Sequence, residues 1–182
     1  MPIPDKKHYT AEEFFKMFPE SNSERYELYE GEVVAMASPN ELHQDIVLGL
    51  GSTIRSYIKN NGGRCKTMIA PFDVKLSEDI VVIPDVTVIC DSSKLDGKRC
   101  NGAPDWIIEV TSSNRHDDLI VKYSLYQKYG VREYWIVDPK YQKTLVYFFE
   151  KSDLPNIYTF DTPVPVEIYD RNLTITISEL IS

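Results

Sequence analysis

Apolar residues in the second quarter of the chain recur at intervals of three and four positions, which is the spacing of one face of an α-helix. They are Ile46, Leu50, Ile54, Tyr57 and Ile58. Asn40 can cap the start of this helix, and Gly62-Gly63 can end it. We therefore predict a long helix between these residues.

Capping and stop signals predict two further helices. Thr10 stands three positions before Glu13 and just ahead of an apolar run, which is the pattern of a capping box, and Pro19 ends that helix. The other helix is predicted at residues 117–129, where Gly130 ends it.

The remaining segments have the alternating or β-branched pattern of short strands. One hairpin is predicted at residues 25–36, with its turn at Glu30-Gly31. Another is predicted at residues 72–90, and its second arm must be bulged or broken at Pro84. Further strands are predicted at residues 105–111, 133–138, 144–150, 157–160 and 173–177. This order indicates an α/β (α+β) fold, with a mixed β-sheet core flanked by helices and extra β-hairpins at both ends.

Length and charge narrow the class of protein. The chain has 182 residues, which predicts a single domain spanning residues 1–182, and a net charge of -8. An acidic total repels polyanions at long range and argues against a general nucleic-acid coat protein. One stretch is different: residues 46–72 contain no acidic residue but include Arg55, Lys59, Arg64 and Lys66. This basic patch is either a solvated helix face or a phosphate-facing surface.

The chain has the composition of a soluble protein of a reducing compartment. No stretch approaches the ~20 apolar residues of a membrane span, and the start lacks the layout of a signal peptide. Its three cysteines, Cys65, Cys90 and Cys100, form no CxxC pair, so we expect unreactive thiols. We therefore expect a cytoplasmic protein that does not bind a membrane.

Two acidic residues interrupt apolar strands. Glu109 is in the middle of the strand predicted at residues 105–111, and Asp85 follows Pro84 in an apolar run. A buried carboxylate needs a metal, a basic side chain or a proton. If the strands are neighbours, about 4.8 Å apart, both carboxylates can bind one divalent cation. Alternatively, Asp85 caps a turn and Glu109 pairs with a buried base. Asp105 shares a strand face with Glu109 but lies ~13 Å away along the strand, which favours a structural role.

Lys122 lies on the apolar face of the helix predicted at residues 117–129, at a helical spacing from Leu119, Tyr126 and Tyr129. A carboxylate beside it would offset the cost of burying its ammonium. Lys122 is thus placed to be the cationic neighbour of Glu109 and, beside a metal, to orient a water nucleophile. The alternative is that its stem crosses Tyr126 and its ammonium reaches solvent.

The order and spacing of several short motifs resemble the PD-(D/E)XK nuclease superfamily, and more closely its family of restriction endonuclease-like proteins of unassigned role. The matching stretches are Tyr26-Glu27-Leu28 with Gly31-Glu32, His43-Gln44, Pro84-Asp85-Val86, Pro104 through Ser112 with Glu109-Val110-Thr111, Asp118 with Lys122 and Tyr126, and Gly130 through Pro139. Together they cover most of residues 9–140.

The resemblance implies a restriction endonuclease-like fold in which Asp85 and Glu109 bind Mg²⁺, with Mn²⁺ as the alternative ion. A lysine normally follows the second acid by two positions in this superfamily, and this chain has Thr111 there. The resemblance implies that Lys122 supplies the ammonium instead. It also implies that Glu27, His43 and Gln44 complete the pocket.

The sequence therefore leads to two hypotheses. The first is a Mg²⁺-dependent phosphodiesterase, a DNA endonuclease that acts as a homodimer with one site per strand and uses Asp85, Glu109 and Lys122 in catalysis. The second is a nuclease fold that has lost turnover and serves as a nucleic-acid-binding or assembly module. The net charge and Thr111 favour the second hypothesis, whereas Lys122 and the two acids favour the first.

Overall fold

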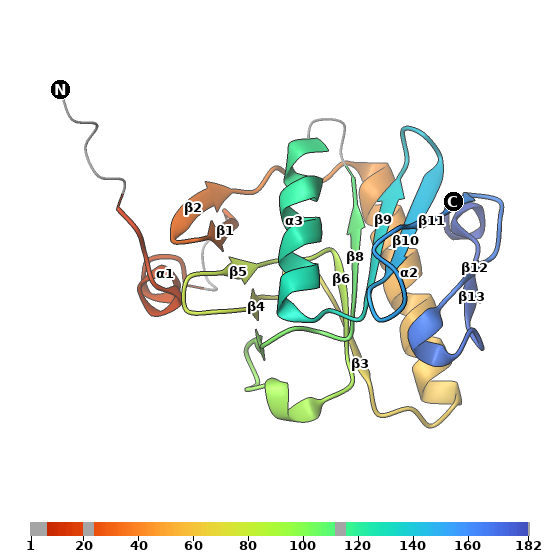
Figure 1. The fold of residues 1–182 in the computed structure, drawn as a ribbon, viewed down its shortest axis with the longest axis horizontal. Helices are drawn as coiled ribbons and strands as arrows, with labels where there is room; N and C mark the ends of the chain where they lie inside the picture. Colours follow the sequence, from red (N-terminus) through yellow and green to blue (C-terminus); the bar gives the residue numbers. More distant parts are fainter. Residues whose placement is uncertain (1–6, 20–23, 112–115, 182) are drawn as a thin grey trace.

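A computed structural model of the chain describes residues 7–19, 24–111 and 116–181, and Figure 1 shows its ribbon. Its described α-helices are α1 (Ala11–Met17), α2 (Glu41–Asn60) and α3 (His116–Tyr129). Short 3-10 helices occur at Ser92–Lys94, Glu167–Tyr169 and Ile177–Leu180. The predicted caps are confirmed: Thr10 and Glu13 form a capping box at α1, and the Asn40 side chain accepts from the backbone N–H of His43 at α2.

The described strands form three sheets. The largest has the order β11 (Asn156–Thr159), β10 (Lys143–Phe148), β9 (Glu133–Asp138), β8 (Trp106–Val110), β6 (Val86–Ile89) and β3 (Lys66–Ile69). The second has the order β2 (Glu32–Ala35), β1 (Tyr26–Tyr29), β5 (Val81–Val82), β4 (Val74–Lys75) and β7 (Cys100–Asn101). The third pairs β12 (Val164–Pro165) with β13 (Thr174–Ile175). The predicted hairpin at residues 25–36 is present as β1 and β2.

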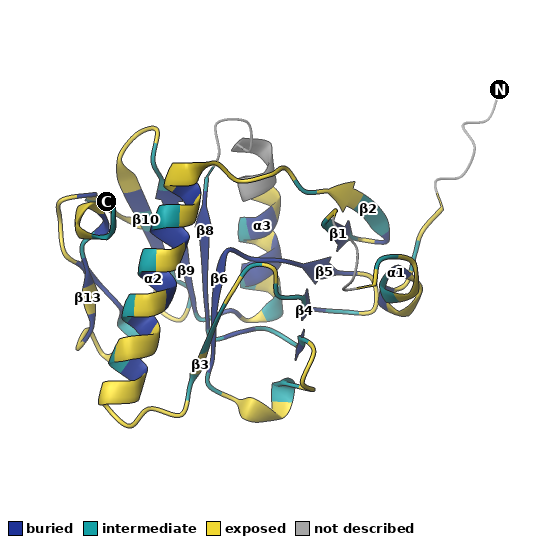
Figure 2. Cartoon of the chain, turned by 180° about the vertical axis from the view of Figure 1, so that it is seen from behind, coloured by how far each residue is buried: buried dark blue, intermediate teal, exposed yellow. Residues whose placement is uncertain are grey.

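Helices α2 and α3 cover opposite faces of the largest sheet, as Figures 1 and 2 show from the two sides. In β8, Trp106 and Ile108 belong to the buried cluster that includes the apolar face of α2, whereas Ile107 belongs to the cluster that includes Tyr126 of α3. Because both faces of this strand are covered, its side chains are apolar at successive positions. The same alternation places Glu109 on the α3 side.

The predicted break at Pro84 divides one apolar run between two sheets. Strand β5 pairs with β1 and β4 in the second sheet, whereas β6 pairs with β3 and β8 in the largest sheet. Proline lacks the backbone N–H that a continuous ladder needs, so the chain changes sheets here. Asp85 occupies the short crossing between β5 and β6, which places an acidic residue where the two sheets meet.

The expectation of unpaired thiols is wrong for two of the three cysteines. Cys65 directly precedes β3, Cys90 directly follows β6, and the two sulfur atoms form a disulfide. The antiparallel register that pairs Lys66 with Ile89 places them opposite each other. Cys100 is free and buried, and burial raises the pKa of its thiol to about 11.

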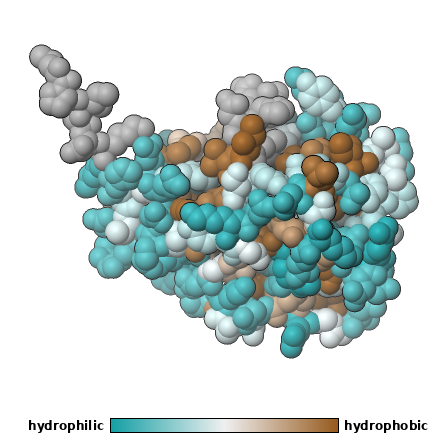
Figure 3. Space-filling view, viewed as in Figure 1, coloured by the Kyte–Doolittle hydropathy of each residue, from teal (hydrophilic) through white to brown (hydrophobic). Residues whose placement is uncertain are grey.

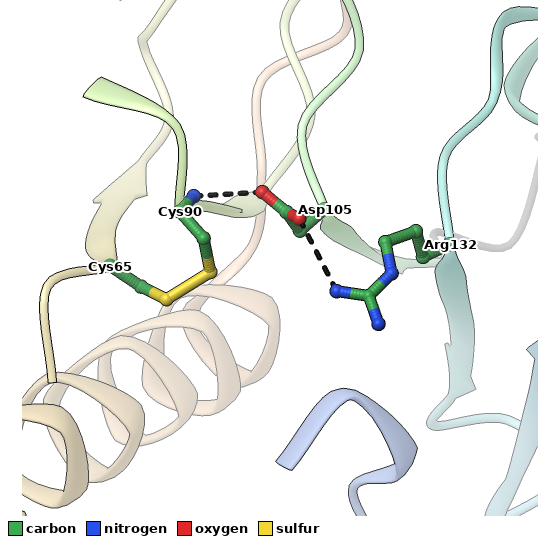
Figure 4. The surroundings of a disulfide bond; sticks show 4 residues. All are labelled: Cys65, Cys90, Asp105 and Arg132. Carbon is green, nitrogen blue, oxygen red and sulfur yellow. Dashed lines mark hydrogen bonds and ion pairs between the residues drawn. A yellow bond between two sulfur atoms is a disulfide. The ribbon is translucent and has the colours of Figure 1, made fainter. Parts of the chain in front are cut away.

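Asp105 lies beside this disulfide and has the structural role that we expected for it (Figure 4). One of its oxygens accepts a hydrogen bond of 2.7 Å from the backbone N–H of Cys90, and the other lies 3.4 Å from the Arg132 guanidinium. These contacts tie the start of β8 to the end of β6 and to the loop before β9.

The last part of the chain packs against the α2 side of the largest sheet. Val164, Val166, Ile175 and Ile177 are buried in the same cluster as α2. The buried Glu133 carboxylate fastens this segment, since it accepts hydrogen bonds from Trp135 Nε1 at 2.7 Å and from the backbone N–H of Ile168 at 2.8 Å.

Within the described part of the chain, the helices are all too short or too polar to cross a lipid bilayer.

Glu133→Ala is expected to lower the free energy of unfolding by about 3 kcal/mol, because it leaves two buried N–H donors without acceptors. Urea denaturation followed by circular dichroism measures this change. Glu150→Ala is the control: it removes an exposed carboxylate that pairs with Arg132, and such pairs contribute about 1 kcal/mol or less. Equal effects of the two substitutions would contradict the anchoring role of Glu133.

Candidate active site

Strand pairing brings the two predicted acids together. Strands β6 and β8 are antiparallel neighbours, and Val86 pairs with Ile108. Extending this register by one residue places Asp85 opposite Glu109. Directly opposed residues of antiparallel strands have Cβ atoms about 5 Å apart. Asp85 lies just before β6, and its charge is close enough to raise the pKa of Glu109. The strand adjacency that the sequence hypothesis required is therefore present.

Two groups on separate elements hold the Asp85 carboxylate. Its Oδ2 accepts a hydrogen bond of 2.8 Å from the backbone N–H of Val110 and lies 3.1 Å from His43 Nε2. His43 is in the first turn of α2, so the start of this helix is fixed against the end of β8. Asp85 is only 5% exposed, and these two contacts fix the orientation of its carboxylate.

The Glu109 carboxylate contacts two side chains of α3. Lys122 Nζ lies 3.0 Å from Glu109 Oε1, and the Tyr126 hydroxyl donates to the same oxygen at 2.7 Å. Lys122 and Tyr126 are one helical turn apart, so they lie on the same face of α3. Lys122 is only 1% exposed. The buried pairing that the sequence predicted is therefore found, and the alternative in which the ammonium reaches solvent is not.

Glu27 joins the site from the other sheet. It is in β1, and its Oε1 lies 3.4 Å from Lys122 Nζ and accepts from the backbone N–H of Ile83 at 2.8 Å. Its other oxygen accepts from the Tyr29 hydroxyl at 2.9 Å. The Lys122 ammonium thus lies between a carboxylate of each sheet, which makes it the electrostatic link between them.

Among the described residues, the charges of this cluster do not balance. Three buried carboxylates, those of Glu27, Asp85 and Glu109, share one ammonium and one imidazole. Burial raises the pKa of Glu109 from 4.5 to about 7; Lys122 opposes this rise, and the charges of Asp85 and Glu27 add to it. Burial also raises the pKa of the Tyr126 hydroxyl, and the nearby charge of Glu109 raises this pKa further. The site therefore has a surplus of negative charge that favours a proton or a cation.

A cavity of about 550 Å³ gives access to the Asp85 side of the cluster. Its lining includes Asp85, His43, Gln44, Arg25 and Tyr26. Glu27, Glu109 and Lys122 are buried and do not line it. Gln44 is exposed, and no hydrogen bond joins it to the three carboxylates among the described residues.

A larger hollow lies elsewhere and lacks this chemistry. It has a volume of about 750 Å³ and lies between β2 and α3, where Val34, Ile120 and Val121 are exposed. In the space-filling view, brown apolar residues gather on this face of the molecule (Figure 3). Neither Asp85 nor Lys122 lines this hollow. The acidic pair, and not the size of a hollow, therefore locates the candidate active site.

The donor set fits a hard divalent cation that keeps part of its water shell. Among the described residues, the hydrogen bonds of both acids fall on one oxygen each, Oδ2 of Asp85 and Oε1 of Glu109. The second oxygen of each carboxylate is thus available for a cation, and Mg²⁺ is usually held by one or two carboxylates together with water and substrate oxygens. No group of three or more His, Cys, Asp or Glu side chains within the described part of the chain would form a complete metal cage.

Two hydroxyl donors were not identified as site residues from the sequence. Tyr126 occurs one helical turn after Lys122, and Tyr29 occurs two residues after Glu27 on the same strand face. The spacing was visible in the sequence, but aromatic residues at core positions are common, so it did not distinguish a buried hydroxyl donor from an ordinary core residue.

Comparison with a known structure agrees with the fold described above. A crystal structure of "a putative nuclease belonging to DUF820" from Anabaena variabilis is 24% identical to this chain and superposes with a TM-score of 0.77. The match covers 94% of this chain and 96% of that one. No protein with a curated description matches. The likeness defines the class as a restriction endonuclease-like fold, as the sequence predicted.

A family model described as "Putative restriction endonuclease" (Uma2) matches residues 11–178. The chain therefore belongs to that family, and the nuclease-like resemblance read from the sequence is confirmed.

In metal-free buffer, removing the charge of Glu109 and removing that of Lys122 are expected to change the free energy of unfolding in opposite directions. The folded protein binds a proton at Glu109 between about pH 4.5 and 7, whereas the unfolded chain does not, so stability falls as pH rises through this range. Glu109→Gln should therefore stabilise the protein at pH 8, on the order of 1–3 kcal/mol, and much less at pH 5.

Lys122→Met should destabilise the protein at pH 8 by about 3 kcal/mol, because two buried carboxylates lose their cation. Thermal unfolding of both variants at pH 5 and pH 8, in the presence of EDTA, measures these changes. A Glu109→Gln variant that is less stable than the wild type at pH 8 would contradict the surplus of negative charge in this cluster.

Proposed function

We propose that this protein is a metal-dependent phosphodiesterase, a DNA endonuclease, with its active site at Asp85, Glu109 and Lys122. The observation that carries the proposal is the pair of neighbouring carboxylates, Asp85 and Glu109, with a surplus of negative charge among the described residues and with Asp85 lining an open cavity. Membership of the restriction endonuclease-like family supports the same chemistry.

Asp85 and Glu109 would hold a Mg²⁺ ion, with Mn²⁺ as a possible substitute. Such an ion, when bound, lowers the pKa of a coordinated water and polarises a phosphoryl oxygen. Asp85 is oriented by His43 and by the backbone N–H of Val110, so its carboxylate needs little rearrangement to act as a ligand.

Lys122 would supply the positive charge that stabilises the negative charge developing on the phosphate. It replaces the lysine that the superfamily has two positions after the second acid, where this chain has Thr111. Glu27 holds the Lys122 ammonium in place, and Tyr126 holds the Glu109 carboxylate that pairs with it. Cleavage of both DNA strands needs two such sites, and we propose a homodimer as their source.

Purified protein is expected to nick supercoiled plasmid in the presence of Mg²⁺ or Mn²⁺ and not in EDTA. Glu109→Gln and Asp85→Asn should lower the nicking rate about 10²-fold or more, because each removes a charged ligand from the site. Asp105→Asn is the control, since it removes a carboxylate that directly precedes the same strand and contacts Arg132 instead. The proposal is overturned if the folded Glu109→Gln variant nicks as fast as the wild type.

An ammonium supplied from the strand should replace the one supplied from the helix. Lys122→Met is expected to abolish nicking, and the double variant Lys122→Met, Thr111→Lys should recover part of it, because Thr111 shares a strand face with Glu109. Single-turnover nicking rates measure the rescue. A rate for the double variant no higher than that of Lys122→Met alone would contradict the role given to the ammonium.

Calorimetric titration with Mg²⁺ or Mn²⁺ separates the enzyme from a fold that has lost turnover. An enzyme should bind the metal in a manner that depends on Asp85 and Glu109. A binding or assembly module with a lapsed site should show no such binding, and that result would favour the second hypothesis.

A further inference from the structure

A hollow of about 470 Å³ lies between the second half of α2 and strand β3. Three basic residues line it, Arg55 and Lys59 from the helix and Lys66 from the strand, and no acidic residue among the described ones does so. All three are exposed. The sequence left open whether this basic stretch is a solvated helix face or a phosphate-facing surface, and the structure adds that the helix and the strand bring its charges around one concave surface.

Ordinary structural roles account for only part of this arrangement. None of the three side chains forms an ion pair with another described residue. Lys59 is in the last turn of α2, where a cation interacts favourably with the helix dipole, but this effect is limited to the last turn. It therefore does not account for Arg55 or Lys66. In a chain with a net charge of -8, three like charges without anionic partners around one hollow favour an external anion.

Strand β3 connects this hollow to the candidate active site. It begins at Lys66, and the two residues that follow it, Ala70 and Pro71, line the cavity that contains Asp85. The backbone N–H of Ala70 also donates to the carbonyl of Asp85 at 3.0 Å. Four residues of strand span about 13 Å, and successive phosphates of one DNA strand are about 3.4 Å apart along the helix axis. The hollow is therefore about four base pairs from the cavity.

Strand β3 is also an edge of the largest sheet, and no other described strand covers its outer side. Figure 2 shows β3 and the exposed side of α2 on the same side of the molecule. The hollow thus presents positive charge beside an open strand edge.

We propose that the α2–β3 hollow binds the phosphate backbone of duplex DNA about four base pairs from the phosphate in the active-site cavity. This inference rests on the proposed nuclease function, because the distance of about four base pairs is counted from the cavity at Asp85. Arg55, Lys59 and Lys66 contact phosphates and not bases, so they position the duplex without reading its sequence.

The test is binding of a fluorescent 30-base-pair DNA duplex to the full chain in EDTA, measured by anisotropy at several salt concentrations. The triple variant Arg55→Gln, Lys59→Gln, Lys66→Gln should bind about tenfold or more weakly at about 0.1 M salt. The slope of log affinity against log salt should become shallower by up to about three, and duplexes of unrelated sequence should be affected equally.

The matched control is Lys128→Gln, Lys140→Gln, Lys143→Gln, which removes the same charge from three exposed lysines outside the hollow. It should retain most of the affinity. Equal weakening by both triple variants, or no weakening by the first, overturns the proposal. Because the assay contains no metal, its outcome is separate from that of plasmid nicking. If the protein does not nick plasmid but its DNA binding still depends on the three basic residues of the α2–β3 hollow, the nuclease function is refuted and the DNA-binding surface is supported.

Discussion

The Lys122 ammonium lies between two buried carboxylates, 3.0 Å from Glu109 and 3.4 Å from Glu27. Burying a carboxylate without a cation costs several kcal/mol, so the sheets can bring these acids together only with the ammonium present. This requirement also determines where the elements around Lys122 must lie. Helix α3 must present Lys122 and Tyr126 to β8, strand β1 must approach from the other sheet, and the chain must change sheets at Asp85. Even so, one ammonium does not balance the acids, and the remaining negative charge gives the site its affinity for a proton or a cation.

Much of this site could be predicted from the sequence because its residues break the local pattern. An acid inside an apolar strand and a lysine on the apolar face of a helix are each costly unless they are paired. Glu109 and Lys122 were therefore recognisable as partners before their contact was known. Pro84 likewise marked the place where an apolar run could not continue as one strand. The helix caps at Thr10 and Asn40 were predictable because they depend on hydrogen bonds within a few residues.

Other features depend on contacts between distant segments and left no local signal. Strand β3, Lys66–Ile69, is a short edge strand whose residues show no clear alternation, so neither it nor its register with β6 was predicted. The Cys65–Cys90 disulfide was missed for the same reason, since its pairing follows from that register. The contact of His43 with Asp85 also depends on where the start of α2 meets the sheet, which no spacing in the sequence defines.

Helix α2 relates the acidic site to the basic hollow. Its first turn holds His43 against Asp85, and its second half carries Arg55 and Lys59. A helix of 20 residues is about 30 Å long and nearly rigid, so a duplex held at one end has a fixed position relative to the other. This matters in a chain whose net charge of -8 repels DNA at long range. A local cluster of positive charge cannot reverse that repulsion everywhere, but it makes one orientation of the duplex more favourable than the others. In the proposed complex, the separation of charge along α2 would therefore orient the duplex as well as attract it.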